Sequence, residues 1–172
     1  MELPERFAQG DLDAFETLFR QFQSEVYRWI IRIVRDPGIA EDLTVETFWR
    51  IYQARARFDP TRSFGAWARR IATNAAIDHL KTIRAEELLS DEQGRFDPPN
   101  PAIQRDIRDR VELAFAQLPP KLQVVARLAL IEERTYPEIA EALGISAGAV
   151  KSRVFRAVRI LRKKLERMGV QP

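Results

Sequence analysis

Polar side chains suited to DNA binding recur along one side of the helix predicted near the C-terminus. Steps of 100° per residue from Val150 place Ser152, Arg156, Arg159 and Lys163 together on that side. A guanidinium can bind a guanine edge through two hydrogen bonds, a serine hydroxyl can bond to several bases, and cations pair with phosphates. These residue types predict a surface that binds DNA and makes or breaks no covalent bond.

The other side of the same helix is apolar, and it would hold the polar side towards a partner. Its residues fall within a stripe about 100° wide, the width expected of a helix that packs on a core. They are Val150, Val154, Ala157, Val158, Leu161, Leu165 and Met168. If the charges are considered alone, an ordinary surface helix with a solvated cationic face is the alternative interpretation.

A shorter helix is predicted just before this one. Its apolar stripe runs from Tyr136 to Leu143, Gly144 follows as a helix stop, and Ser146 is suited to cap the next helix. A short helix, a tight turn with glycine and a longer second helix predict a helix-turn-helix, whose second helix enters the DNA major groove. Gly148 and the alanines beside it keep the start of that helix slim, so its backbone can approach DNA closely.

The composition excludes several other classes of protein. No apolar run in the 172 residues approaches the ~20 residues of a membrane span. The chain has no cysteine and one histidine, so we expect no disulfide, no bound metal and no cofactor. Its first residues are acidic and polar, unlike a secretory signal, and cytoplasmic residence is expected. The net charge is only +3, but residues 111–172 hold 11 Lys and Arg against 6 Asp and Glu, which places the basic surface there.

The pattern predicts an all-α fold of two small helical domains joined by a flexible linker. In the first domain, apolar residues at helical spacing predict helices at about 11–35, 39–56 and 63–84. The linker is predicted because three prolines within four positions, several acids and a glycine interrupt the helical pattern. The expected boundaries are residues 1–85 for the first domain, 86–108 for the linker and 109–172 for the second domain with its helix-turn-helix.

Two helix faces in the first domain are candidates for binding. The helix at 39–56 carries Asp42 and Glu46 near Trp49, which suits a basic protein partner but is also typical of a solvated face. The helix at 63–84 presents cations, an amide and an aromatic, which can grip the phosphates and stack on the bases of single-stranded nucleic acid. The latter residues are Trp67, Arg69, Arg70, Thr73 and Asn74, although Trp67 could equally be half-buried core.

Five stretches in order resemble one protein family. They are GDLDAFETLF near the start, AEDLTVETFWRIY (40–52), FDPTRSFGAWARRIATNAAIDHLK (58–81), LPPKLQVVARL (118–128) and TYPEIAEALGISAGAVKSRVFRA (135–157). The sequence resembles the extracytoplasmic-function (ECF) sigma factors, the small class of bacterial RNA polymerase promoter-specificity subunits. The resemblance covers nearly the whole chain. With 172 residues, we expect no room for the middle domain that housekeeping sigma factors contain.

The resemblance implies a role for each domain. Residues 1–85 would bind core RNA polymerase and recognise and melt the −10 element, and residues 109–172 would bind the −35 element as duplex. The implied partners are the clamp helices of the largest polymerase subunit, the polymerase flap, promoter DNA and a separate anti-sigma factor. The implied polymerase contacts are Asp42, Glu46, Phe48 and Trp49. The implied −10 contacts are Arg57, Phe58, Arg62, Trp67, Arg69, Arg70 and Asn74. The implied −35 contacts are Ser146, Gly148, Ala149, Lys151, Ser152, Phe155, Arg156 and Arg159.

Two positions depart from the family pattern. Ala149 stands where threonine is common, and Arg134 stands where glycine is common.

The alternative function is a stand-alone helix-turn-helix regulator whose first 85 residues sense a ligand or dimerise, although such regulators usually read paired half-sites as dimers. An enzyme is not expected, because the sequence has no Gly-rich phosphate loop, no metal cluster and no nucleophile–base constellation.

Overall fold

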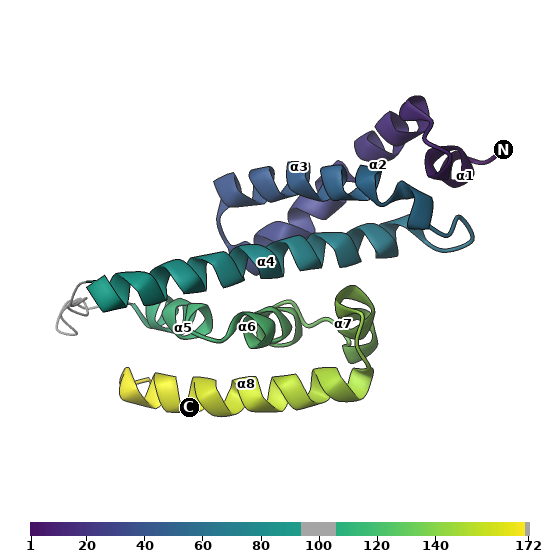
Figure 1. Cartoon of the computed structure of the whole chain (residues 1–172). Helices are drawn as coiled ribbons and strands as arrows, with labels where there is room; N and C mark the ends of the chain where they lie inside the picture. Colours follow the sequence, from purple (N-terminus) through teal and green to yellow (C-terminus); the bar gives the residue numbers. More distant parts are fainter. Residues whose placement is uncertain (94–105, 171–172) are drawn as a thin grey trace. The chain divides into compact units, whose positions relative to one another are not determined.

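The structure, a computed structural model, describes residues 1–93 and 106–170 (Figure 1). Every regular element in these two ranges is a helix, which confirms the all-α prediction. Within the described part of the chain no helix is both long and apolar enough to cross a membrane.

Contacts divide the chain into two compact units. The first holds Met1–Asp78 and Ala140–Gly144, and the second holds His79–Ile139 and Ile145–Pro172. The assignment of two functional domains to residues 1–85 and 109–172 stays a prediction.

The N-terminal helices begin where capping residues occur in the sequence. Asp11 and Asp36 each accept hydrogen bonds from two backbone N–H groups at the start of the helix that follows them. Pro37 occupies the first turn after Asp36, where its missing N–H removes no helical hydrogen bond. The third helix therefore starts at Pro37, two positions before the predicted start. The helices are α1 (Leu3–Ala8), which was not predicted, α2 (Leu12–Val34), α3 (Pro37–Gln53), the 3-10 helix η1 (Arg55–Arg57) and α4 (Phe64–Gln93).

Aromatic rings form much of the core of these helices. The Phe7 ring centroid lies 5.9 Å from that of Phe58 and 5.6 Å from that of Phe64, while Phe58 and Trp67 are 4.8 Å apart. Tilted and edge-on pairs at such distances are the favourable geometry for aromatic side chains. The cluster of these four rings ties α1 and the segment after η1 to the start of α4.

Helix α4 extends into the segment predicted as a linker, so that prediction is wrong for residues 86–93. The stretch Ala-Glu-Glu-Leu-Leu at 85–89 consists of strong helix formers, and no glycine or proline follows before Gly94. The prediction gave too much weight to the acids in this stretch and to prolines that come later. The Pro-rich part of the predicted linker, residues 94–105, lies outside the described residues, and Ile107 already begins the next helix.

The C-terminal helices pack around a largely aliphatic core. Helix α8 lies against α5 and α6 (Figure 1). Phe115, Leu118 and Leu122 form one buried cluster with Ala157 and Leu161. The elements are α5 (Ile107–Ala116), α6 (Pro120–Ala126), the π-helix η2 (Arg127–Ile131), α7 (Tyr136–Leu143) and α8 (Ala147–Arg167).

One arginine is buried within the C-terminal helices. The Arg127 side chain is 2% exposed, and its two terminal nitrogens donate hydrogen bonds of 2.7 and 3.2 Å to the two carboxylate oxygens of Glu112. Its guanidinium carbon also lies 5.5 Å from the centroid of the Phe115 ring. Arg127 is the first residue of the π-helix, and its carbonyl accepts a hydrogen bond from Glu132 N at 3.0 Å. The Arg127–Glu112 ion pair thus connects α5 to the start of the π-helix η2.

Candidate nucleic-acid interface

The helix-turn-helix has the predicted local structure. Helix α7 ends at Leu143, Gly144 turns the chain with a φ of +67°, and α8 starts after Ser146. Gly144 adopts this left-handed conformation without the steric cost that a side chain would add. The Ser146 hydroxyl accepts a hydrogen bond of 3.1 Å from Ala149 N, which confirms the predicted cap.

Helix α8 has the two faces that its sequence predicts. Val150, Val154, Ala157 and Leu161 are all buried. The predicted −35 contacts beyond the first turn lie on the opposite side and are exposed; they are Lys151, Ser152, Phe155, Arg156 and Arg159. Ser146 and Gly148 are exposed at the start of the helix, whereas Ala149 is half-buried. The structure therefore brings the predicted −35 residues together along one end and side of α8.

The α8 surface combines available cations with apolar surface. Within residues 1–93 and 106–170, Lys151, Arg156 and Arg159 take part in no ion pair, so they are available to phosphates or base edges. The Phe155 side chain is 65% exposed and lines a shallow hollow with Tyr136. An exposed aromatic beside cations is suited to contact a thymine methyl in the major groove.

Lys164 belongs to the inner side of α8 and not to its cationic face. Its ammonium donates a hydrogen bond of 3.3 Å to the Gln117 side chain, and burial lowers the pKa of the Lys164 side chain below its ordinary value. Arg162 and Lys163, in contrast, are exposed.

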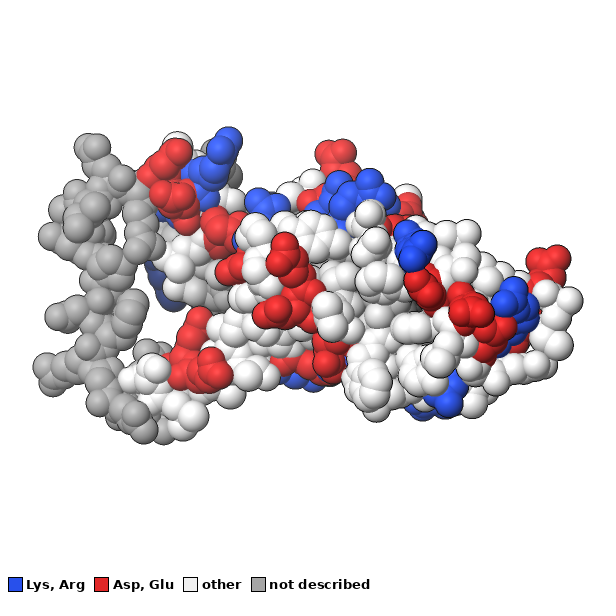
Figure 2. Space-filling view, turned by 90° about the horizontal axis from the view of Figure 1, so that it is seen from above, with Lys and Arg blue, Asp and Glu red and all other residues white. Residues whose placement is uncertain are grey.

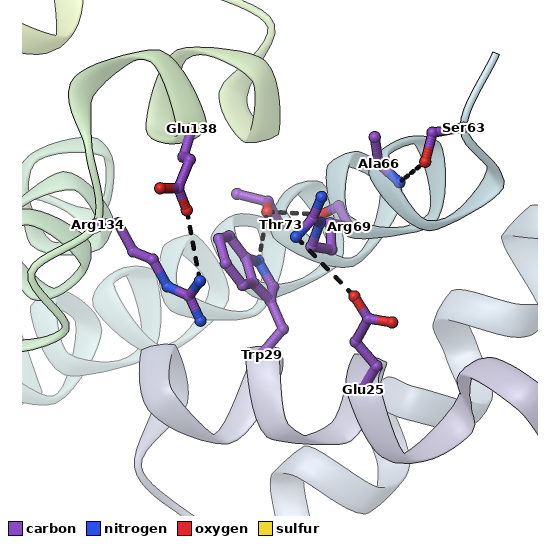
Figure 3. A network of polar contacts seen from close by, with 8 residues as sticks. All are labelled: Glu25, Trp29, Ser63, Ala66, Arg69, Thr73, Arg134 and Glu138. Atoms are coloured by element: carbon purple, nitrogen blue, oxygen red, sulfur yellow. Dashed lines mark hydrogen bonds and ion pairs between the residues drawn. The ribbon is translucent and has the colours of Figure 1, made fainter.

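The segment from η1 to the start of α4 carries exposed cations on a hydrogen-bonded loop. Arg57 and Arg62 are exposed, while Asp59 accepts hydrogen bonds from the backbone N–H and the hydroxyl of Thr61 at 3.0 and 2.7 Å. The Thr61 hydroxyl, more than its backbone N–H, lowers the pKa of the Asp59 carboxyl. The Ser63 hydroxyl accepts from Ala66 N at 3.2 Å and caps α4 (Figure 3). The loop is therefore held by its own polar groups.

Phe58 is not on this surface, contrary to its predicted contact with the −10 element. Its side chain is 4% exposed and lies in the cluster with Phe7, Phe64 and Trp67. Phe58 therefore anchors the loop that carries Arg57 and cannot itself reach a base. Trp67 is half-buried in the same cluster, which leaves only part of its ring accessible.

The predicted binding side of α4 contains both exposed and buried residues. Arg70 and Asn74 are exposed, but Thr73 is fully buried and accepts a hydrogen bond of 2.9 Å from the Trp29 indole N–H. Arg69 is half-buried, and its guanidinium lies 3.9 Å from the Glu25 carboxylate (Figure 3). Helical spacing could not show that Thr73 turns towards α2.

Helix α3 offers a second surface with acidic and apolar side chains. Asp42, Glu46 and Trp49 are exposed, the last to 56%, as predicted. Val45 is 69% exposed beside them and was missed, although the spacing of 42, 45, 46 and 49 puts all four on one helix face. Figure 2 looks onto the side of the molecule that includes α3 and shows acidic side chains among uncharged surface.

Phe48 is the second predicted contact that the structure places inside. Its side chain is 3% exposed, and its ring centroid lies 4.8 Å from that of Phe19. A partner on α3 would therefore meet Val45 and Trp49, while Phe48 fixes α3 to α2. Arg50 borders this surface and bonds to Glu46 at 3.1 Å and Asp78 at 2.9 Å. Burial works to lower the pKa of Arg50, but these two carboxylates outweigh it and raise that pKa above its usual value.

The exposed surfaces of α3, α4 and α8 carry groups suited to binding partners. In the part of the chain that the structure describes, no three His, Cys, Asp or Glu side chains lie close enough together to hold a metal ion. The exposed groups are those of recognition: guanidinium, ammonium, amide, hydroxyl and aromatic side chains on helix faces.

Comparison with known proteins matches both halves of the chain. Residues 18–86 match the family model described as Sigma-70 region 2, and residues 108–161 match the one described as Sigma-70, region 4. "RNA polymerase sigma factor CarQ" of Myxococcus xanthus is 32% identical over 97% of this chain and 98% of its own length. "ECF RNA polymerase sigma factor SigW" of Bacillus subtilis is 29% identical over 91% of each chain. Among solved structures, CnrH in complex with the cytosolic domain of CnrY is similar with a TM-score of 0.58 and 25% identity, over 95% of each chain.

Proposed function

The chain belongs to the ECF sigma factors, which direct RNA polymerase to promoters, and we propose that its helices divide the recognition of one promoter between them. The helix-turn-helix binds the −35 element as duplex, and the N-terminal helices bind core polymerase and the opened −10 element. The observation that carries this proposal is α8: within the described residues its exposed side holds cations that form no ion pair, and its opposite side is buried.

At the −35 element, the start of α8 enters the major groove. Gly148 and Ala149 let the backbone approach, Ser152 and Arg156 reach base edges, and Phe155 contacts a thymine methyl. Lys151 and Arg159 flank these residues and pair with phosphates. The backbone N–H groups at the start of α8, next to Ser146, also bind a phosphate. Specificity then comes chiefly from Arg156, because a bidentate arginine distinguishes guanine from the other bases.

At the −10 element, the loop after η1 and the first turns of α4 bind the strand that is exposed when the duplex opens. Arg57 and Arg62 on the loop and Arg69, Arg70 and Asn74 on α4 contact phosphates and bases. The accessible part of Trp67 offers a stacking surface, and Phe58 holds the loop from beneath. This surface binds the negatively charged backbone of the opened DNA strand and needs no catalytic group.

On the polymerase side, α3 docks through Asp42, Val45, Glu46 and Trp49. The two carboxylates complement a basic surface such as the one implied for the clamp helices, and the two apolar side chains supply area that is removed from water. The helix-turn-helix domain would meet the polymerase flap. The protein catalyses no reaction and uses no cofactor or metal, and it acts in the cytoplasm, where polymerase and chromosome are.

Control by a separate anti-sigma factor is part of the proposal. Its support is the family resemblance and the similar structure of CnrH, which was solved with the cytosolic domain of another protein bound to it. A protein that covers the exposed residues of α3 or α8 would prevent binding to polymerase or to DNA.

Reconstitution with core RNA polymerase tests the function. Genomic DNA fragments bound by the reconstituted holoenzyme are selected and sequenced, and they should share two elements separated by a constant spacer. Transcripts from these fragments should appear only when the chain and the core enzyme are both present. Binding of the chain alone to a palindrome as a dimer, without any binding to polymerase, would instead establish the stand-alone regulator.

A further inference from the structure

Helix α2 holds the side chain of Arg69, which projects from the neighbouring helix α4 (Figure 3). The guanidinium carbon of Arg69 lies 5.7 Å from the centroid of the Trp29 ring, and its Nη1 lies 3.9 Å from Glu25 Oε1. The Arg69 side chain is still 33% exposed. The guanidinium is therefore placed by an aromatic face and a carboxylate, yet it can be reached from solvent.

The Trp29 ring is itself fixed by a buried hydroxyl. Trp29 Nε1 donates a hydrogen bond of 2.9 Å to Thr73 Oγ1, and the Thr73 hydroxyl donates one of 2.7 Å to the backbone carbonyl of Arg69. Trp29 is 5% exposed and Thr73 is fully buried. A buried indole N–H needs a partner, and Thr73 supplies it one helical turn after Arg69. The hydroxyl thus connects the ring under the guanidinium to the backbone that carries the guanidinium.

The guanidinium keeps most of its binding capacity. Among residues 1–93 and 106–170 it donates no hydrogen bond, and Glu25 meets it only at the distance of a loose ion pair. Pairs of this kind at a half-exposed surface are weak, whereas phosphate accepts two parallel hydrogen bonds from an arginine. A phosphate that approaches from solvent can therefore replace the carboxylate.

We propose that Trp29 and Thr73 are positioning residues for Arg69, and that Glu25 occupies the anion position until a phosphate of the opened promoter strand takes it. This role depends on the proposed function of the α4 surface. Single-stranded DNA has no fixed spacing of phosphates, so a cation that is already oriented loses less freedom when it binds. Glu25 also disfavours phosphates that arrive without the rest of the strand, because they must displace it.

The test uses holoenzyme assembled from the full chain and a radiolabelled promoter fragment from the selection described above. The fragment is prepared in two forms, fully duplex and with its −10 segment held open by mismatches. Mobility shifts over a series of salt concentrations give the dissociation constant and its salt dependence. The variants are Arg69→Ala, Trp29→Phe, which keeps a ring but removes the N–H, Thr73→Val, which removes only the hydroxyl, and Glu25→Gln. Glu16→Gln is the matched control, since Glu16 pairs with Arg20 at 2.7 Å elsewhere on α2.

On the open fragment, Arg69→Ala should weaken binding about tenfold and reduce the salt slope by about 0.7, the value for one phosphate on a single strand. Trp29→Phe and Thr73→Val should each weaken binding to the open fragment on the order of threefold and lower the same salt slope. The reason is that an Arg69 guanidinium that is no longer oriented contacts the phosphate for a smaller fraction of the time. Glu25→Gln should tighten binding to the open fragment about two- to threefold, since the competing charge is gone. Glu16→Gln should change neither quantity.

The outcomes separate the two proposals. If Arg69→Ala leaves binding to the open fragment unchanged, the proposed −10 role of the α4 surface is wrong. If Arg69→Ala weakens binding but Trp29→Phe and Thr73→Val change neither affinity nor salt slope, the positioning role is wrong and the −10 role stands. Should Thr73→Val fail to fold, Trp29→Phe and Glu25→Gln decide the matter: an unchanged affinity in both overturns the inference, and a loss in the first with a gain in the second supports it.

Discussion

The two surfaces proposed to bind DNA hold their cations differently. On α4, Arg69 is placed by Trp29 and Glu25, which come from another helix. On α8, in contrast, Arg156 and Arg159 extend from the helix without an ion pair in the described part of the chain. Duplex DNA presents phosphates and base edges at fixed positions, so flexible arginines on a rigid helix can find them. An opened strand has no such order, and the protein must supply it.

Arg127 is a buried cation fixed by an ion pair, and removing its partner Glu112 should cause the largest loss of stability. Glu112→Ala leaves a buried guanidinium unpaired, and we expect a loss of about 3 kcal/mol in the free energy of unfolding, at the low end of such cases because Glu112 is half-exposed. Arg127→Leu is the control: it removes the charge together with the need for a partner and should change stability by less than about 1 kcal/mol. Urea unfolding measures both. Similar losses in the two variants would show that Arg127 acts by volume and not as a held charge.

Among the exposed cations of α8, Arg156 should have the largest effect on binding. Arg156→Ala should weaken binding to the −35 duplex by about 1–3 kcal/mol and relax the preference at one base pair. Lys163→Ala should instead weaken binding to all sequences and lower the salt slope by about 0.9. Affinities for the selected −35 element and for its single-base variants distinguish the two. An equal loss on every sequence would reduce Arg156 to a phosphate contact.

The exposed cations of α8 also depend on a helix that begins at the right residue. Ser146→Ala removes the hydroxyl that caps α8 and should lower the free energy of unfolding by about 1 kcal/mol. Ser152→Ala, on the exposed side of the same helix, is the control and should leave stability unchanged or raise it slightly, because alanine is the better helix former. Urea midpoints compare the two variants. A Ser146→Ala protein as stable as the wild type would mean that the turn alone fixes the start of α8.

The smallest effect is expected at the loop that carries Arg57 and Arg62. The Asp59 carboxyl has a lowered pKa in the folded state, so the stability that it contributes is present above its unfolded pKa and is lost as the pH falls through its folded pKa, below about pH 4. Thr61→Val removes the hydroxyl that is the main cause and should raise the Asp59 pKa towards that of an unfolded chain. Carboxyl carbon NMR over a pH series measures this pKa directly. An unchanged value in Thr61→Val would show that the loop is held otherwise.

Helical spacing predicted the elements and the faces that depend on one helix alone. Val150, Val154 and Arg156 could be assigned to the inside or the outside of α8, because that helix has one apolar stripe and one polar side. The same reasoning failed where the partner of a side chain is on another helix. Phe48 and Phe58 look like exposed contacts in the family pattern, but they are buried by Phe19 and Phe7 from elements far away in the sequence.

Backbone conformation and buried charge were also hidden from the sequence. Arg134 was singled out as the position where glycine is common, but the residue in the left-handed region before α7 is Glu133, with a φ of 53°. The burial of Arg127 could not be foreseen either, because it depends on a carboxylate fifteen residues earlier that lies on a different helix.

The three tryptophans, all among the N-terminal helices, give the protein three built-in optical probes. Trp49 is largely in water, Trp67 is half-covered by other rings, and Trp29 is enclosed beneath a guanidinium. Fluorescence emission should therefore shift to shorter wavelength when α3 meets polymerase, and change in intensity when the cation above Trp29 moves. The helix-turn-helix contains no tryptophan, so its binding to a −35 duplex should leave the tryptophan emission spectrum almost unchanged.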